Sequence, residues 1–332
     1  MILAGDIGGT NARLAYYRHD KGKFVVVREQ VFPSREFRGL DEIVVKFVTE
    51  SGIHPDSASF GVAGPVREGL VETSNLPWSV DSAVLAQKLH LDSVELINDL
   101  AAQAYGIHCL CEADTVALNK VSGTAVGNQA VVAAGTGLGE AGLFWDGQRH
   151  LVFACEGGHC DFAPRNELEI ELLRYLHTRF GHVSYERIVS GPGLVNVYLF
   201  LRDSNRGEEP SSLRDEMLAG DPAAAVSRAA LSGKCGLAEQ ALDLWISIYG
   251  AEAGNMALKV LATGGVYLGG GIAPKILSKL AGPLFMQGFL SKGRMQALLE
   301  TIPVRVITND KTGLLGAACY AERKSSVSAT IA

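Results

Sequence analysis

A carboxylate and a glycine-rich turn stand together at the start of this chain. Asp6 ends an apolar run, and Gly8, Gly9, Thr10 and Asn11 follow it before a second alternating run begins. Consecutive backbone N–H groups in such a turn form a concave anion site. Glycine permits positive φ and leaves no Cβ in the way of a ligand. The stretch favours a phosphate site with Asp6 as a ligand for hydrated Mg²⁺, although an ordinary Gly-Gly hairpin stays open as the alternative.

Two further glycine-rich turns follow apolar runs later in the chain. Residues 130–145 read AVVAAGTGLGEAGLFW and place Gly135, Thr136 and Gly137 between two apolar strands. Residues 266–277 read VYLGGGIAPKIL and place a glycine triplet before a helix that we expect to start near Pro274. A repeated strand–turn–strand unit predicts a duplicated fold with a nucleotide between its halves.

Acidic and imidazole side chains supply a second kind of chemistry. Asn98 and Asp99 follow a short apolar strand. A carboxylate beyond the carboxyl end of a strand is placed to take a proton from a substrate hydroxyl, whereas a helix N-cap is the alternative role. Glu156 and His159 flank two glycines and could face one small ligand. Cys155, His159 and Cys160 also suggest zinc, which we disfavour because structural zinc sites have four ligands in recognisable spacing.

Seven motifs of the chain resemble those of the bacterial ATP-dependent glucokinases, which belong to the superfamily of sugar kinases, actin and large heat-shock chaperones. They are DIGGTNARLA, LINDLAAQA, GTGLG, EGGHCDFAP, ERIVSGPGLVNVY, LGGGIAP and GLLGAACY. The resemblance runs from Ile2 to about Tyr320 and is weakest over residues 202–237. It implies an α/β, two-domain actin-like ATPase (duplicated ribonuclease H-like) fold with an interdomain cleft. The implied domains are 1–107 plus 310–325 and 108–309.

The resemblance also implies an activity and the residues that carry it. A glucokinase transfers the γ-phosphoryl of ATP to the 6-hydroxyl of glucose, with Mg²⁺, at the entry to glycolysis. Asp99 aligns with the family's catalytic base. The implied sugar-binding residues are Asn75, Asn98, Asp99, Glu156, His159 and Glu186. The implied nucleotide-binding residues are Gly5, Asp6, Ile7, Gly8, Gly9, Thr10, Asn11, Gly135, Thr136, Gly137, Gly270 and Gly271, with Asp6 for the metal.

Without the resemblance, the residues support only ATP-dependent phosphoryl transfer to a polyol. A kinase of fructose, mannose or an N-acetylhexosamine therefore stays open, as does a non-catalytic actin-like ATPase. A related group of sugar kinases carries a CxCGxxGC zinc loop, and this chain departs from that pattern.

Composition limits the partners. The 332 residues suffice for two domains. The net charge of −6 argues against nucleic acid or an anionic membrane as a partner. No apolar run reaches the roughly 20 residues of a membrane helix, and we expect no signal peptide. Six cysteines without scaffold spacing indicate reduced thiols and a cytoplasmic protein, and the resemblance implies a homodimer.

Hydrophobic periodicity predicts the elements that position these residues. Strands at 2–17 and 23–31, a helix at 40–51 and a strand at 58–66 give the order βββαβ. Further on, we expect a helix at 166–180 that Asn166 caps and Gly181 ends. Residues 202–236 predict a loop with one short helix, and 237–262 a helical region interrupted near Gly250 and Gly254. A strand at 303–308 and a helix at 313–323 complete the pattern, the helix packing back on the first domain.

Overall fold

The computed structural model describes residues 1–20, 23–73 and 76–331. It divides into two compact units. Unit 1 comprises Met1–Asp114, Val152–Ala154 and Asn309–Ala332, and unit 2 comprises Thr115–Leu151 and Cys155–Thr308. Residues 108–114, expected in the second domain, fall in unit 1, where Asn309 Nδ2 donates to Asp114 Oδ1 at 3.0 Å.

Unit 1 is built on a five-stranded sheet in the order β3-β2-β1-β4-β8. Its strands are β1 (Ile2–Ile7), β2 (Asn11–Asp20), β3 (Lys23–Pro33), β4 (Ser57–Val62) and β8 (Glu95–Asn98). The first three strands pair antiparallel, whereas β1, β4 and β8 run parallel. The carboxyl ends of β1 and β8, which carry Asp6 and Asn98, therefore lie at the same edge of the sheet.

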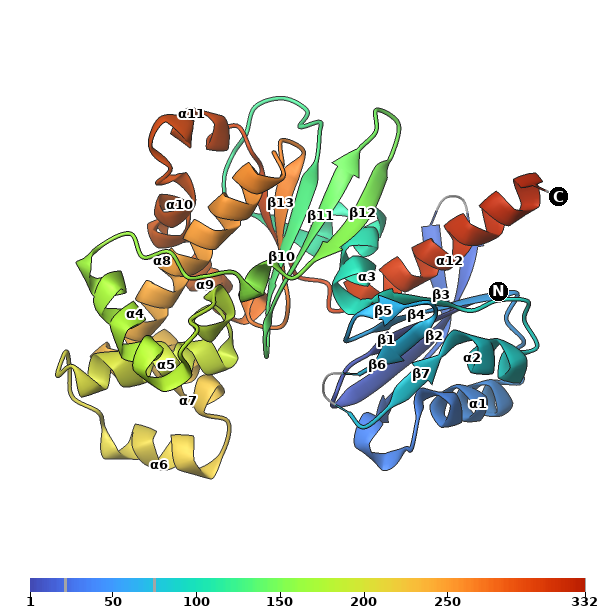
Figure 1. The fold of residues 1–332 in the computed structure, drawn as a ribbon, viewed down its shortest axis with the longest axis horizontal. Helices are drawn as coiled ribbons and strands as arrows, with labels where there is room; N and C mark the ends of the chain where they lie inside the picture. The colour runs from blue at the N-terminus through green and yellow to red at the C-terminus, as the bar shows by residue number, and fades with distance from the viewer. Residues whose placement is uncertain (21–22, 74–75, 332) are drawn as a thin grey trace. The chain divides into compact units, whose positions relative to one another are not determined.

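Side-chain alternation along β1 sends residues to two separate cores. Leu3 and Ile7 pack with α1 (Leu40–Ser51) and α2 (Ser82–Leu89), whereas Ile2 and Ala4 pack with α12 (Thr312–Ile331). Helix α3 (Asp99–Gly106) lies beside α12 on that second face (Figure 1). The predicted bounds of α1 are confirmed, and Gly52 ends the helix at φ 66°. A small sheet of β5 (Val66–Arg67), β6 (Leu70–Glu72) and β7 (Ser79–Asp81) completes unit 1 with the short helices η1 (Ser34–Glu36), η2 (Ile107–Cys109) and η3 (Glu112–Asp114).

Unit 2 repeats this arrangement of strands. Its sheet has the order β12-β11-β10-β13-β14-β9. The strands are β9 (Thr115–Ala117), β10 (Gln129–Ala134), β11 (Leu138–Trp145), β12 (His150–Cys155), β13 (Gly265–Gly269) and β14 (Val304–Ile307). As in unit 1, an antiparallel hairpin of the first two strands continues into parallel partners. The predicted duplication is confirmed, because β10, β11, β13 and β14 follow the order of β1, β2, β4 and β8.

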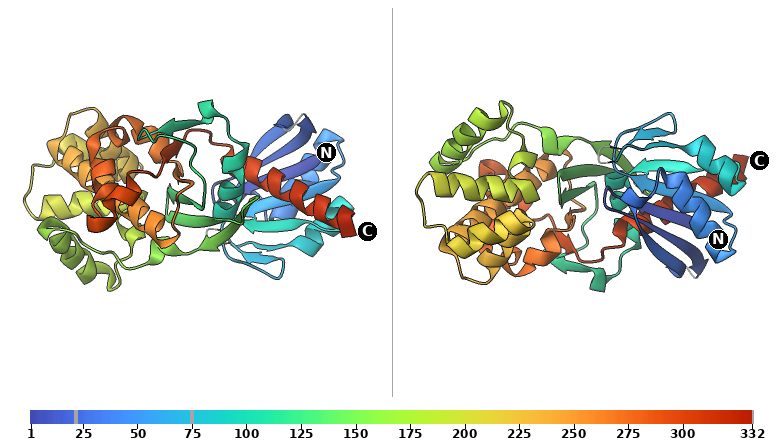
Figure 2. Two further views of the ribbon diagram at one scale, coloured as in Figure 1. Left: turned by 90° about the horizontal axis from the view of Figure 1, so that it is seen from above. Right: turned by 90° about the horizontal axis from the view of Figure 1, so that it is seen from below.

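Helices gather against one side of the unit 2 sheet, coloured green to orange in both views of Figure 2. The longest is α8 (Gly236–Lys259), which is buried on nearly every side. Its predicted interruption near Gly250 and Gly254 is wrong, since the helix runs through both positions. The two glycines instead let α10 (Pro283–Leu290) approach, because a Cβ at Gly250 would collide with the Phe285 carbonyl oxygen. The other helices are η4 (Gly157–His159), α4 (Glu167–Phe180), η5 (Tyr185–Arg187), α5 (Gly191–Asp203), α6 (Ser211–Ala219), α7 (Pro222–Leu231), η6 (Ala273–Ile276), α9 (Leu277–Leu280), η7 (Gly293–Met295) and α11 (Gln296–Leu299).

Two predictions for unit 2 have different outcomes. The helix capped by Asn166 is confirmed as α4, where the Asn166 amide oxygen accepts from the Glu169 N–H at 3.0 Å. The expectation of one short helix in residues 202–236 is wrong, since α6 and α7 both lie there.

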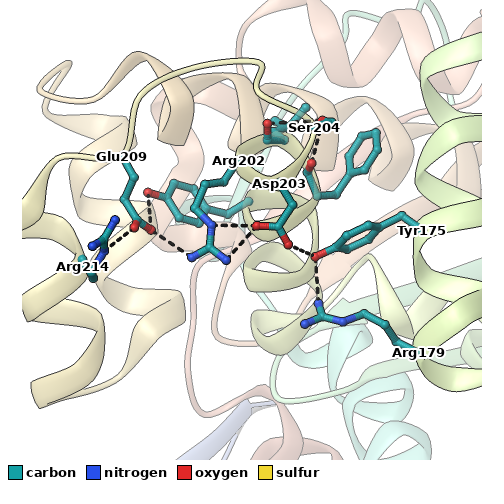
Figure 3. Close-up of polar contacts among 10 residues, drawn as sticks. Tyr175, Arg179, Arg202, Asp203, Ser204, Glu209 and Arg214 are labelled. Atoms are coloured by element: carbon teal, nitrogen blue, oxygen red, sulfur yellow. Dashed lines mark hydrogen bonds and ion pairs between the residues drawn. The ribbon is translucent and has the colours of Figure 1, made fainter.

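A buried carboxylate anchors the segment between α5 and α6 (Figure 3). Glu209 accepts from Arg202 Nη1 at 3.3 Å and from Arg214 Nε at 2.5 Å, and only 4% of its side chain is exposed. Asp203 accepts from the Tyr175 hydroxyl at 2.6 Å, which joins α5 to α4. These contacts depend on residues far apart in sequence, so local polarity could not predict the two helices.

Candidate active site

The first glycine-rich turn joins β1 to β2 and is held by a side chain from η1. Gly8 N donates to Asn11 O at 2.9 Å. The buried Ser34 hydroxyl donates to Gly8 O at 2.8 Å, and Ser34 N donates to Thr10 O at 2.9 Å. Gly8 does not have the positive φ that we expected; it is needed for space, since a Cβ there would lie 3.3 Å from Asn11 O. The turn is therefore fixed by the protein itself.

The remaining residues of this segment divide between core and surface. Gly5 and Ile7 are buried in β1 between β2 and β4, where they support the turn. Gly9 is half-buried, whereas Thr10 and Asn11 are exposed. A phosphate could therefore approach the turn from the side of Thr10 and Asn11.

Asp6 lies at the end of β1, opposite Arg13 of β2. Helix α12 begins against it, and a Cβ at Gly313 would lie 3.4 Å from the Asp6 carboxyl carbon. Burial raises the pKa of Asp6, Arg13 lowers it, and Asp310 raises it. A partly desolvated carboxylate gains from a nearby cation, so this position fits a ligand of hydrated Mg²⁺.

Asn98 and Asp99 mark the junction between β8 and α3. The Asn98 amide oxygen accepts from Leu100 N at 2.9 Å and from Ala101 N at 3.3 Å, and its Nδ2 donates to Gly64 O at 3.2 Å. Asn98 is thus the N-cap, and Asp99 is the first residue of the helix. The helix-cap alternative for Asp99 is wrong, because its neighbour holds that position. Asn75 lies outside the described residues, although Trp78 nearby is buried and its Nε1 donates to Phe37 O at 3.2 Å.

In unit 2, Glu186 joins the second glycine-rich turn to the His159 loop. Its Oε2 accepts from Leu138 N at 2.9 Å, and a Cβ at Gly137 would lie 2.5 Å from the same oxygen. Its Oε1 lies 3.9 Å from His159 Nδ1. The turn is closed by a 2.8 Å bond from Gly135 N to Gly137 O, and Thr136 is exposed at its tip. The reading of Glu186 as a solvated residue is wrong, since 29% of its side chain is exposed and its carboxylate contacts the turn.

Glu156, His159 and Glu186 form one polar cluster in unit 2. His159 Nε2 lies 4.0 Å from Glu156 Oε2. More than half of the Glu156 and His159 side chains is exposed. At about 4 Å these groups do not hydrogen-bond to one another, so a hydroxyl-rich ligand could bond to each of them. The structure brings these three predicted residues together.

The third glycine-rich turn follows β13. Gly270 has φ 80°, and a Cβ there would collide with Ala134 O. Gly271 is exposed, with nothing within 4 Å of its Cβ position. The helix expected near Pro274 is present as η6 and continues into α9. The turn thus lies beside the end of β10, close to the second glycine-rich turn.

A search for metal clusters and membrane spans gave the same result for both. Within residues 1–20, 23–73 and 76–331, no three His, Cys, Asp or Glu side chains are grouped to hold a metal ion. None of the helices described there is both long and apolar enough to span a membrane.

Sequence reasoning missed two contributors to these sites. Ser34, which fixes the first turn, had no local signal because its partners lie 24 or more residues earlier. Glu140, buried beneath η4, did have one: it is the only charged residue in the apolar run of residues 130–145.

Comparison with known proteins identifies the class of this fold. A ROK-family glucokinase from Streptomyces griseus, solved in complex with glucose and AMPPNP, shares the fold at 20% identity and a TM-score of 0.62, covering 97% of this chain and 99% of that one. A glucokinase crystal structure from an Antarctic psychrotroph is 33% identical with a TM-score of 0.86, covering 97% and 98%. The fold is that of the sugar kinases with actin-like ATPase architecture.

The sequence comparisons are more specific. The glucokinase of Nostoc sp. is 43% identical, covering 97% of this chain and 99% of that protein. The glucokinase of Yersinia pestis is 35% identical, covering 97% and 96%. A family model described as glucokinase matches residues 3–324. The chain belongs to the glucokinase family.

Proposed function

We propose that this member of the glucokinase family transfers the γ-phosphoryl of ATP to the 6-hydroxyl of glucose, giving glucose 6-phosphate and ADP. The observation that carries the proposal is the position of Glu186. One oxygen of its carboxylate holds the glycine-rich turn through Leu138 N, and the other lies 3.9 Å from His159. A phosphate-type turn and a hydroxyl-binding cluster therefore share one rigid support, as transfer between a nucleotide and a sugar requires.

In the proposed mechanism Asp99 is the base. The 6-hydroxyl gives its proton to the Asp99 carboxylate while the sugar oxygen bonds to the γ-phosphorus and the bond to ADP breaks. Asp99 follows the capped end of β8, where the cap fixes its backbone. Because such transfer depends mainly on positioning and charge stabilisation, we assign Asp99 the proton and assign the orientation of glucose to other residues.

Glucose would be held by amides, acids and an imidazole. We infer contacts from Asn75, Asn98, Glu156, His159 and Glu186. Asn98 uses its oxygen and one N–H in the cap and with Gly64, which leaves its second N–H for a sugar hydroxyl. The exposed Glu156 and His159 side chains would bind hydroxyls directly.

ATP would lie against the three glycine-rich turns. Backbone N–H groups of Gly8–Asn11 and of Gly135–Gly137 are suited to phosphates, and the open surface at Gly270 and Gly271 is suited to the adenosine. Mg²⁺, held through water by Asp6, would neutralise the phosphate charge. The cytoplasm and a homodimer complete the proposal. Free thiols, found at all six cysteines, support the first, and light scattering of the purified protein tests the second.

Product analysis tests the proposed reaction. The protein is incubated with MgATP and ¹³C-glucose, and phosphorus–carbon coupling identifies the phosphorylated carbon by NMR. We expect coupling at carbon 6 only. Phosphorylation at carbon 1, or ADP formation without a phosphorylated sugar, would contradict the proposal.

A further inference from the structure

Glu140 is a buried acid beneath the loop that carries Glu156 and His159. It lies on β11 with 1% of its surface exposed. Neither of its carboxyl oxygens accepts from a donor among the residues that the structure describes. A Cβ at Gly157 would collide with Glu140 Oε2, so the carboxyl group lies directly against the backbone of η4. The conformation of η4 therefore depends on the state of this group.

A second buried carboxyl group faces Glu140. Glu252 of α8 is fully buried and accepts from Asn255 Nδ2 at 2.8 Å and from Lys259 Nζ at 3.2 Å. It is also in hydrogen-bonding contact with the Glu140 carboxyl group. Two ionised carboxylates repel one another in a buried site, and Lys259 compensates only one charge. One proton on Glu140 removes the conflict, because the acid O–H can donate to the Glu252 carboxylate.

The surroundings of the pair favour that proton. Burial first, and then the charge of Glu252, raise the pKa of Glu140 to about 8, while Lys259 works in the opposite direction. The titratable groups around the pair come from several packed elements: Tyr249, Glu252 and Lys259 of α8, Cys155 of β12, Glu156, His159 and Cys160 at η4, Tyr185 of η5, and Lys292 after α10.

We propose that Glu140, as a neutral acid hydrogen-bonded to Glu252, is a positioning residue that holds η4 in its sugar-binding conformation, so that its ionisation weakens glucose binding. The inference rests on the proposed function, because it assigns Glu156 and His159 to glucose. Ionisation would place a second negative charge against the Gly157 backbone and remove the donor to Glu252. The nucleotide-binding turns do not contact this carboxyl group through any described side chain, so the KM for ATP should not follow it.

The pH dependence of glucose binding tests the inference. The KM for glucose and the Kd from calorimetry are measured from about pH 6.5 to about pH 9 for wild type and Glu140→Gln. If only the protonated form binds, the wild-type values should rise about tenfold over this range. Gln donates to Glu252 without ionising, so Glu140→Gln should bind like wild type at about pH 6.5 and keep that affinity at about pH 9. Titration of His159 would act equally in both proteins.

A matched control and a second substitution sharpen the comparison. Glu169 is another fully buried acid of unit 2, paired with Arg165 on α4, and Glu169→Gln should keep the wild-type pH profile. Glu140→Leu lacks a donor and should raise the KM for glucose at every pH, with the KM for ATP within about twofold; if it fails to fold, the Gln comparison decides alone.

Two results would overturn the inference: a wild-type KM that does not rise with pH, or an equal rise in Glu140→Gln. In either case, glucose phosphorylation at about pH 6.5 would leave the proposed function intact. Failure of the wild type to phosphorylate glucose at that pH would instead contradict the proposed function.

Discussion

Asp99 stands one position beyond the N-cap of α3, and this offset separates its chemistry from the stability of the helix. Asn98 supplies the capping oxygen. Asp99→Asn should therefore fold like wild type, because the cap and the size of the side chain are kept. Its kcat should fall by about 10²–10⁴-fold, the usual contribution of a general base. Thermal melting and steady-state kinetics measure the two effects. A kcat close to wild type would contradict the role of Asp99.

The stability of the cap provides the control for that variant. Asn98→Ala removes the side chain that accepts from Leu100 and Ala101. It should lower the free energy of unfolding by about 1 kcal/mol. A loss of that size in Asp99→Asn instead would mean that Asp99 is the cap.

Asp6 carries the second prediction at the residue scale. Wild-type protein stripped with a chelator should be inactive and recover fully with Mg²⁺ alone. Asp6→Asn should need at least about tenfold more Mg²⁺ for half-maximal activity, since a charged ligand becomes neutral. Because burial raises the pKa of Asp6, the carboxylate stabilises the fold less as pH rises, and the variant should be no less stable at about pH 7. An unchanged Mg²⁺ requirement would contradict the assignment.

At the scale of elements, glycine inside a helix had two possible meanings. Gly250 and Gly254 in α8 were expected to interrupt the helix, but they make room for the backbone of α10. Gly250→Ala, which raises helix propensity, should nevertheless destabilise the protein by about 1–3 kcal/mol through overpacking. Gly236→Ala, at the exposed start of the same helix with open space around it, should be neutral or stabilising. Chemical denaturation of both variants checks this, and equal effects would contradict the packing explanation.

Glu209 determines a pH-dependent contribution between α5 and α6. Burial alone would raise its pKa, but Arg214 and Arg202 outweigh burial and hold it below the ordinary value. A lowered pKa gives stability that is present above the unfolded value of about 4.5 and is lost as pH falls through the folded value. Glu209→Gln should cost about 1–3 kcal/mol at about pH 7, and this difference should shrink below about pH 4.5.

An exposed ion pair nearby is the control for Glu209. Glu216 pairs with Arg228 and is 47% exposed. Glu216→Gln should change the unfolding free energy by less than about 1 kcal/mol at either pH. If both Gln variants behaved alike, the burial of Glu209 would not be the cause.

These elements show what sequence can and cannot predict. Helix α1 was predicted to the residue because its apolar face and terminal Gly52 are local signals. Glu156, His159 and Glu186 could be selected as candidates, but only the fold shows the Glu186 contact with Leu138, 48 residues away. The two helices of 202–236 and the Glu140–Glu252 pair depend on long-range contacts, which periodicity does not contain.

At the scale of the whole molecule, duplication explains why the chain has two similar turns. Each sheet begins with a hairpin whose turn follows the first strand, and each continues into parallel strands. The units differ in what lies between their third and fourth strands: α1 in unit 1, and α4 to α8 in unit 2. The larger insertion supplies Glu186 and Glu252, so the unit with the extra helices also carries the sugar cluster.

The most direct test of this account is kcat/KM over a panel of sugars and phosphoryl donors. Glucose with MgATP should exceed fructose, mannose and N-acetylated hexosamines, because a site built to bond hydroxyls leaves buried groups unpaired when they are misplaced. Each such group costs about 1–3 kcal/mol, so we predict a preference of about tenfold or more, which corresponds to roughly 1.4 kcal/mol. A panel in which another hexose exceeded glucose tenfold would contradict the central claim, as would the absence of phosphoryl transfer to any sugar.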